Sequence, residues 1–300
     1  MLKIAHSKIY AHPLPEGHRF PMIKYELIPE QLLRTGIIEP SNLFEPLPAE
    51  ESIVLLTHDS NYVKDLKELL LDDKHIRRIG FPLSEELVKR EFIICGGSIQ
   101  CCDYAIEYGI SMNIAGGTHH AFSNRGEGFC LLNDMAVAAN YLLESKKAHR
   151  ILFVDLDVHQ GNGTASIFRN NKNVFTFSMH GKNNFPFFKE TSDLDIELND
   201  GCEDKEYLNL LQHHLEQIFG NFKPDFVFYN SGVDILSTDK LGKLKISEQT
   251  CFERDRYVFE TCKNLKTPVV TAMGGGYSSK ISDIINAHCN TFRAAVETFF

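Results

Sequence analysis

The residues best suited to metal chemistry lie in the segment Asp155-Leu-Asp157-Val-His159, directly after an apolar run at 151–154. The run is typical of a buried strand, and open α/β sheets bind ligands where such strands end. Asp157 and His159 are two residues apart, so on an extended backbone their side chains point to the same side and can hold one ion. Alone, the pattern is equally typical of a helix-capping carboxylate followed by a histidine in a loop.

A third candidate ligand is Asp234, which ends the sequence Gly232-Val-Asp234 just after a predicted strand at 225–229. Two carboxylates and one imidazole neutralise a divalent ion and leave positions open for water and substrate, as in catalytic metal sites. An aspartate in such a turn more often caps a helix. The argument for Asp234 therefore rests on its location and not on its residue type.

Two further stretches carry groups that can move protons or stabilise negative charge. His119 and His120 follow the glycine pair at 116–117, and Tyr277 follows three glycines at 274–276. Adjacent side chains usually diverge, so both histidines can face one site only in a loop conformation that glycines permit. One histidine could then be a general base and the other a charge stabiliser, with the tyrosine hydroxyl as an oxyanion donor.

The order of predicted elements indicates an α/β fold: a single domain over residues 1–300 with a mainly parallel β-sheet and helices on both faces. Strands are predicted at 2–5, 53–56, 111–115, 151–156, 174–179, 225–229 and 269–273. Helices are predicted at 22–35, 61–71, 84–108 with a break near the glycines at 96–97, 134–144, 164–168, 204–219, 247–263 and 282–299. In this layout the stretches rich in Gly, His and Asp all follow strands, so their loops should converge on one edge of the sheet.

Composition narrows the classes of partner. A net charge of -9 argues against a nucleic-acid binder and mildly favours a cationic substrate. The eight cysteines form no C-x-x-C pair and are expected to be reduced, buried thiols. No apolar run approaches the ~20 residues that span a bilayer, so neither a membrane partner nor export is expected. A cytoplasmic protein is the expectation.

Six blocks, in order, give the chain a resemblance to the zinc-dependent histone deacetylases of the arginase/deacetylase superfamily. They are G-G-x-H-H-A at 116–121, G-F-C-x-x-N-D at 128–134, D-x-D-x-H at 155–159, the strand end with Ser178 and His180, G-x-D at 232–234 and G-G-G-Y at 274–277. The resemblance implies a Zn²⁺ ion bound by Asp157, His159 and Asp234. It also implies catalytic roles for His119, His120 and Tyr277, with Asp155 and Asn162 as the partners of the two histidines.

The same resemblance implies a tunnel for the acyl-lysine side chain and a second ion. Phe129, Gly128 and Gly275 would line the tunnel, together with one of three phenylalanines, Phe185, Phe187 and Phe188. A potassium ion would be held in part by Asp155 and Ser178.

One departure from the commonest family pattern bears on substrate. The sequence His159-Gln160-Gly161-Asn162-Gly163 stands where most members have H-H-G-D-G, and this form resembles the class IV branch and its bacterial relatives. The loop at 12–21 also resembles theirs, which implies that it helps to line an inner cavity, with Arg19 as a candidate at the exit for the acid product. The class IV likeness further implies that acyl chains longer than acetyl are accepted.

The predicted function is hydrolysis of the N-acyl amide bond of acyl-lysine, or of a related acylated amine, with release of a carboxylic acid. Two alternatives stay open. A dimetal ureohydrolase of the same fold would need further carboxylate ligands, and a non-catalytic acyl-lysine binding module would keep the pocket without turnover.

Overall fold

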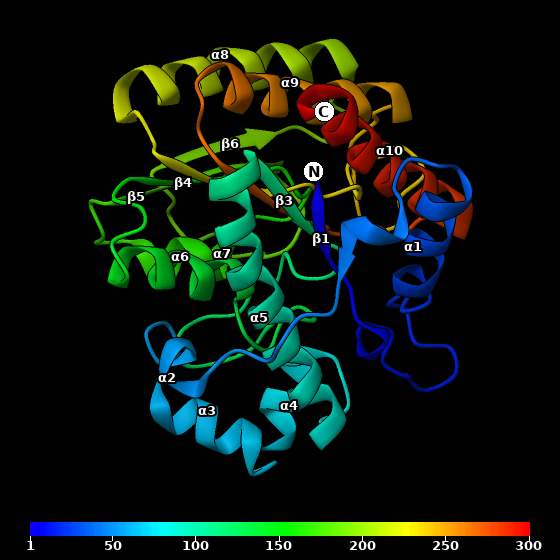
Figure 1. Ribbon diagram of the computed structural model, residues 1–300. Helices are drawn as coiled ribbons and strands as arrows, with labels where there is room; N and C mark the ends of the chain where they lie inside the picture. The colour runs from blue at the N-terminus through cyan, green and yellow to red at the C-terminus, as the bar shows by residue number, and fades with distance from the viewer.

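One eight-stranded sheet runs through the computed structural model, which describes residues 1–300 (Figure 1). Its strand order is β2-β1-β3-β8-β7-β4-β5-β6, and every neighbouring pair is parallel. The strands are β1 (Lys3–Ala5), β2 (Leu43–Phe44), β3 (Ile110–Asn113), β4 (Ile151–Asp155), β5 (Val174–Gly181), β6 (Leu194–Leu198), β7 (Phe226–Asn230) and β8 (Val269–Ala272). The predicted α/β class and parallel sheet are confirmed.

The central strands are apolar along their whole length because helices cover both of their faces. Every residue of β3, β4, β7 and β8 is buried. In the register of these strands, Asp155 at the end of β4 lies opposite Asn230 of β7 and Ser178 of β5. The carboxyl ends of neighbouring strands are therefore level, and the loops that follow them meet at one edge of the sheet.

Helices form the two outer layers. They are α1 (Lys24–Arg34), α2 (Glu51–Val54), α3 (Ser60–Lys67), α4 (Asp73–Ile79), α5 (Glu85–Tyr108), α6 (Asp134–Glu144), α7 (Asn162–Phe168), α8 (Asp204–Phe222), α9 (Glu248–Asn264) and α10 (Ile281–Phe299), with short 3₁₀ helices at Lys8–Tyr10 and Pro40–Asn42. In Figure 1, α8, α9 and α10 lie on one side of the sheet and α5, α6 and α7 on the other, while α2, α3 and α4 form a group at one end. None of these helices has the length and apolar character needed to cross a membrane.

Capping residues set helix starts that were predictable from sequence. The Oδ1 of Asn133 accepts the Ala136 N–H at 3.1 Å, and the Oγ of Ser247 accepts the Thr250 N–H at 3.1 Å. Such bonds satisfy amide groups that the first turn of a helix leaves free. Helix α6 accordingly spans the predicted residues 134–144, and α9 begins one residue after its predicted start.

The predicted break near Gly96 and Gly97 is wrong, because α5 runs unbroken through both residues. The glycines serve close packing instead. A Cβ atom on Gly96 would lie 1.8 Å from the carbonyl oxygen of Leu47, and one on Gly97 would lie 2.7 Å from the Tyr10 hydroxyl. The helix thus tolerates two poor helix formers because only they let neighbouring segments approach.

Residues 53–56 are not a strand, as the short apolar run suggested, but lie at the end of the one-turn helix α2 and in the turn after it. An apolar run of four cannot by itself distinguish a strand from a buried helical turn. The short edge strand β2, the outer strand β6 and helix α4 were not predicted either.

Candidate active site

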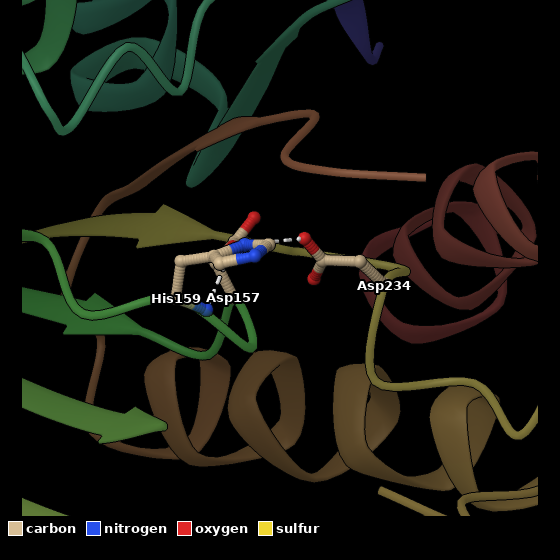
Figure 2. A group of neighbouring side chains, drawn as sticks. All are labelled: Asp157, His159 and Asp234. Atoms are coloured by element: carbon tan, nitrogen blue, oxygen red, sulfur yellow. Dashed lines mark hydrogen bonds and ion pairs between the residues drawn. The ribbon is translucent and has the colours of Figure 1, made fainter. Parts of the chain in front are cut away.

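The three candidate metal ligands lie together at the carboxyl edge of the sheet (Figure 2). The Nδ1 atom of His159 is 3.0 Å from Oδ1 of Asp157 and 3.0 Å from Oδ2 of Asp234. All three side chains are buried, and their ligand atoms lie within 4.8 Å of one another. Asp234, which follows His159 by 75 positions in the sequence, thus joins Asp157 and His159 in one compact cluster.

The backbone that carries Asp157 and His159 is bent and not extended, which corrects the strand geometry expected from their spacing. Strand β4 ends at Asp155, and the following segment is held by side chains. Asp157 Oδ1 accepts the His159 N–H at 2.9 Å, and Asp234 Oδ1 accepts the Val158 N–H at 3.0 Å. The two loops can approach because the neighbouring residue is glycine: a Cβ on Gly232 would lie 2.4 Å from the Cα of Asp157.

The chemistry of this donor set fits a divalent metal ion. Burial lowers the pKa of His159, but its hydrogen bonds to Asp157 and Asp234 outweigh burial and raise the pKa to about 10. Two buried carboxylates thus require a positive charge beside them. One imidazole nitrogen and two carboxylate oxygens are also ligands that Zn²⁺ accepts in catalytic sites.

The two adjacent histidines both reach the site, each with its own partner. His119 Nδ1 lies 2.7 Å from Oδ2 of Asp155, and His120 Nδ1 lies 2.7 Å from Oδ1 of Asn162. Their ring centroids are 4.1 Å apart. The preceding glycines, 116 and 117, have φ angles of 91° and 67°, the left-handed conformation that the glycine pair was expected to supply.

The different partners give the two imidazoles different charges. Burial lowers the pKa of His119, but the Asp155 and Asp157 charges outweigh it and raise the pKa to about 9. Burial and the neighbouring His119 and His159 lower the pKa of His120 well below its usual value, and Asn162 opposes this only weakly. His119 is therefore suited to carry a positive charge and His120 to stay neutral.

Tyr277 reaches the site from the glycine-rich turn after β8. Gly275 and Gly276 have φ angles of 56° and 94°, and a Cβ on Gly275 would lie 2.3 Å from Cγ of Asp234. The Tyr277 N–H donates to Oδ2 of Asp239 at 2.6 Å. Burial, together with the charge of Asp234, raises the pKa of the Tyr277 hydroxyl well above 10, so the hydroxyl keeps its proton and can donate it in a hydrogen bond.

A narrow inner pocket of about 50 Å³ and a wide outer pocket of about 530 Å³ meet at the site. Five residues line both pockets: His120, Gly128, Phe129, His159 and Tyr277. We call the outer pocket the tunnel mouth. Gly128 and Phe129, two of the residues expected to line a tunnel, border both pockets, and Gly275 lines the inner one.

Of the three phenylalanines considered for the tunnel wall, Phe185 is the one that lies against the site. Its ring centroid is 5.0 Å from that of His120, in an edge-on arrangement. The residues Phe187 and Phe188 are 88% and 93% exposed, although Phe187 lines the tunnel mouth. Phe129, which also lines the tunnel mouth, has a φ angle of 68° and donates its N–H to the Ile79 carbonyl at 2.7 Å.

The two side chains expected at a potassium site occupy neighbouring strands. Asp155 and Ser178 are paired in the β4–β5 register, and both are buried. The Ser178 hydroxyl lies 2.9 Å from Nδ1 of His180. The two predicted residues are thus neighbours at the carboxyl ends of adjacent strands.

Comparison with known proteins decides the family. A sequence profile described as "Histone deacetylase domain" matches residues 18–292. The chain belongs to the histone deacetylase family. The members of this family are deacetylase hydrolases. The resemblance to the family that the sequence motifs indicated is therefore confirmed.

Relatives within the family match over most of their length. The chain is 44% identical to an uncharacterised protein of Picosynechococcus sp., with 97% of each chain covered. It is 31% identical to histone deacetylase 2 of Arabidopsis thaliana, covering 89% of this chain and 72% of that protein. The crystal structure of a histone deacetylase homologue from Aquifex aeolicus superposes with a TM-score of 0.82 at 26% identity, covering 97% and 82%.

Several residues that support the candidate site were not recognised from the sequence. Asp239 holds the backbone of Tyr277, and Asn230 donates from Nδ2 to Oδ1 of Asp155 at 3.1 Å. Gln160 accepts the Glu190 N–H at 2.8 Å and donates to Asp195 at 2.9 Å, which ties down the loop that carries Phe185. Lone Asp and Asn residues give no spacing signal, and the motif that contains Gln160 does not indicate its partners, so only the fold reveals these roles.

Arg19 lies elsewhere than the sequence suggested. Its guanidinium carbon is 4.9 Å from the ring centroid of Phe129, at the tunnel mouth. The cationic residues that line the inner pocket are instead Lys24 and Arg90. Lys24 is buried and donates to the Gly275 carbonyl at 2.6 Å.

Proposed function

We propose that the chain is a zinc-dependent hydrolase of the N-acyl amide bond of acyl-lysine. The observation that carries this proposal is the position of His159 Nδ1, 3.0 Å from each of two buried carboxylates, beside two histidines with opposite charge preferences. Asp157, His159 and Asp234 would hold one Zn²⁺ ion. When bound, that ion supplies Lewis acidity to the substrate carbonyl and to the attacking water.

The protein's own side chains move the protons. His120 carries a proton on Nδ1, facing the Asn162 oxygen, and accepts the proton of the attacking water on Nε2. The water oxygen forms a bond to the acyl carbon, and the carbon–nitrogen bond breaks. The imidazolium of His120 then returns the proton to the leaving lysine amine. Cationic His119 and the Tyr277 hydroxyl stabilise the negative charge that develops on the carbonyl oxygen. The products are a free lysine side chain and a carboxylic acid.

The inner pocket favours a short acyl group. A volume of about 50 Å³ suits a small group such as acetyl and not a chain of a dozen carbons. Phe129 and Phe185 would flank the aliphatic part of the lysine side chain. We therefore propose acetyl-lysine as the preferred substrate, in place of the longer chains that the class IV likeness implied.

Two further proposals concern the framework of the site. Asp155 and Ser178, neighbours in the sheet register, would contribute to a potassium ion beneath the zinc. Residues 1–300 would act as one catalytic domain, which is supported by the single sheet and by one hydrophobic core cluster extending from Leu2 to Ala295.

The alternatives have less support. A dimetal ureohydrolase would need a second set of ligands, but the structure contains one group of three or more metal-ligating side chains within reach of a single ion. A binding module without turnover would have no use for the separate partners of His119 and His120.

A turnover assay with one peptide carrying acetyl-, octanoyl- or myristoyl-lysine tests the proposal. We expect release of the free lysine peptide by the zinc-loaded protein, fastest for acetyl, and no release by Asp157→Ala. Tight binding of all three peptides without release would support the binding module instead. Faster turnover of the myristoyl peptide would contradict the argument from pocket volume.

A further inference from the structure

The tunnel mouth carries a charge opposite to that of the whole molecule. Three cationic side chains line it, Arg19, Arg78 and Lys243, and only one carboxylate, Glu127. These residues have a charge of +2 (three positive less one negative), whereas the chain as a whole has −9. The cations come from three separate segments: the loop before α1, the end of α4 and the loop between β7 and α9.

Two of these cations form no close ion pair with a carboxylate of the protein. Arg19 and Arg78 are exposed, and neither takes part in any ion pair within 4.0 Å. The single carboxylate is shared: burial raises the pKa of Glu127, and the charges of Arg125, 3.8 Å away, and of Arg78 both oppose that rise. Lys243 is 4.0 Å from Asp200 and donates to the Asn183 carbonyl at 3.0 Å. The positive charge of the mouth is therefore available to a bound molecule.

The side chain of Arg19 is also held in position at the tunnel mouth by its contact with Phe129. Its guanidinium packs over the ring of Phe129 at 4.9 Å, so an attraction between cation and ring keeps it beside the tunnel wall. Because Arg19 lines the tunnel mouth, its guanidinium can reach the parts of a substrate that stay outside the inner pocket. A guanidinium presents paired N–H donors that match a carboxylate.

From this arrangement we infer that the tunnel mouth selects acyl-lysine that is flanked by acidic residues in a peptide or protein. The inference rests on the proposed function and specifies its substrate. Charges interact strongly only within the ~8 Å screening length of physiological salt, so the local cations outweigh the distant negative charge. The mouth thus reverses the mild preference for cationic substrates that net charge suggested, and it disfavours acetylated polyamines.

Three peptides that differ only beside the acetyl-lysine test the inference directly. One carries an Asp on each side, one a Gln and one a Lys. Exposed ion pairs typically change an equilibrium by about 1.4- to fivefold each. We expect kcat/KM to fall in the order Asp, Gln, Lys over about three- to thirtyfold at low salt, and the span to shrink at 0.5 M salt. Equal rates for the three peptides, or faster turnover of an acetylated polyamine than of the Asp peptide, would overturn the inference.

Variants of the mouth residues test whether these residues cause the preference for the Asp-flanked peptide. Arg19→Gln and Arg78→Gln should each reduce the ratio of Asp-peptide to Lys-peptide kcat/KM, and the double variant should bring it near one. Arg19→Lys keeps the charge and should keep most of the ratio. Lys172→Gln removes one positive charge from the exposed turn before β5, at the opposite edge of the sheet, and should leave the ratio unchanged. A ratio that survives in the Arg19→Gln/Arg78→Gln variant would overturn the assignment.

Binding measurements separate this inference from the proposed function. Fluorescence anisotropy with labelled Asp- and Lys-flanked acetyl-lysine peptides needs no turnover. If no peptide is hydrolysed but the Asp peptide binds more tightly, and Arg19→Gln/Arg78→Gln abolishes the difference, the proposed function is wrong and the charge selection stands. If neither rates nor affinities differ, the charge selection is wrong.

Discussion

The Oδ1 atom of Asn162 lies 2.7 Å from Nδ1 of His120, whereas the neighbouring His119 has a carboxylate at the same distance. Because an amide oxygen only accepts hydrogen bonds, His120 carries its proton on Nδ1 and presents the lone pair of Nε2 to the site. A neutral partner also gives little stabilisation to an imidazolium. The Asn162–His120 contact therefore sets both the tautomer and the protonation state of the proposed general base.

Asn162→Asp should move the acid limb of kcat/KM to higher pH. Burial lowers the pKa of His120 well below its usual value in the natural protein. A carboxylate at the same position favours the imidazolium and typically raises a histidine pKa by about 1 to 3 units. Because the neutral form is the active base, a higher pKa means that activity is lost at a higher pH. The measurement is kcat/KM from pH 4 to pH 9 for both proteins.

Zinc content must be measured in the same samples, since metal loss at low pH would imitate this limb. With zinc still bound, an acid limb that stays in place or moves to lower pH would show that His120 is not the base.

Tyr277→Phe should lower kcat by about a hundredfold to a thousandfold, because loss of one oxyanion donor typically has that effect. The variant keeps the aromatic ring, whose centroid lies 6.2 Å from that of Phe129, so KM should change little. Steady-state kinetics with the acetyl-lysine peptide measure both constants. A fall in kcat of under threefold would remove Tyr277 from the proposed mechanism.

Asp239→Asn should weaken turnover through Tyr277. Asp239 accepts the N–H groups of Leu241 and Gly242 at 2.8 and 2.9 Å with one oxygen, and that of Tyr277 at 2.6 Å with the other. In asparagine one of the two carboxylate oxygens becomes an NH₂ group. An NH₂ group cannot accept a backbone N–H, so at least one of these hydrogen bonds is lost. Hydrogen bonds to charged groups contribute about 1.5–3 kcal/mol, so we expect kcat to fall about tenfold or more.

A double-mutant cycle distinguishes this positioning role from a general loss of structure. Asp239→Asn/Tyr277→Phe should be no slower than Tyr277→Phe alone, because the first change acts through the second residue. Fully additive losses in kcat would contradict the positioning role.

His58 should make the protein less stable in mild acid. Its Nε2 accepts the Asn133 N–H at 3.0 Å, and burial lowers its pKa from 6.5 to about 4. Between these two values the unfolded chain binds a proton that the folded chain does not. The stability due to neutral His58 is therefore present above pH 6.5 and is lost as the pH falls toward 4, by about 2 kcal/mol at pH 5.

Urea unfolding at pH 7 and pH 5 checks this window. The drop in unfolding free energy should be about 2 kcal/mol smaller in His58→Gln, which cannot be protonated at that position. An equal drop in both proteins would mean that His58 is protonated in the folded state.

The sequence predicted the elements whose pattern is set locally and missed those set by tertiary contacts. Asn133 and Ser247 cap helices in the chain itself, so α6 and α9 were predictable within one residue. Gly96 and Gly97 were misread because their reason is the approach of Leu47 and Tyr10, which are distant in sequence. Edge strands such as β2 are too short to show a period.

The candidate site divides in the same way. Asp157, His159 and Asp234 occur in recognisable motifs after strands, and parallel strands bring such loops to one edge. Residues that hold them, such as Asn230 and Asp239, have no motif, since their roles depend on which loops the fold places together. The charge of the tunnel mouth was likewise invisible, because Arg19 and Arg78 become neighbours of the tunnel only in the folded protein.

The most direct test of the account is a titration of metal-free protein with Zn²⁺ while acetyl-lysine turnover is followed. Three convergent ligands, Asp157, His159 and Asp234, predict that activity rises linearly and reaches a plateau at one equivalent of zinc per chain. A plateau at two equivalents, full activity before any zinc is added, or no turnover after one equivalent has bound would contradict it.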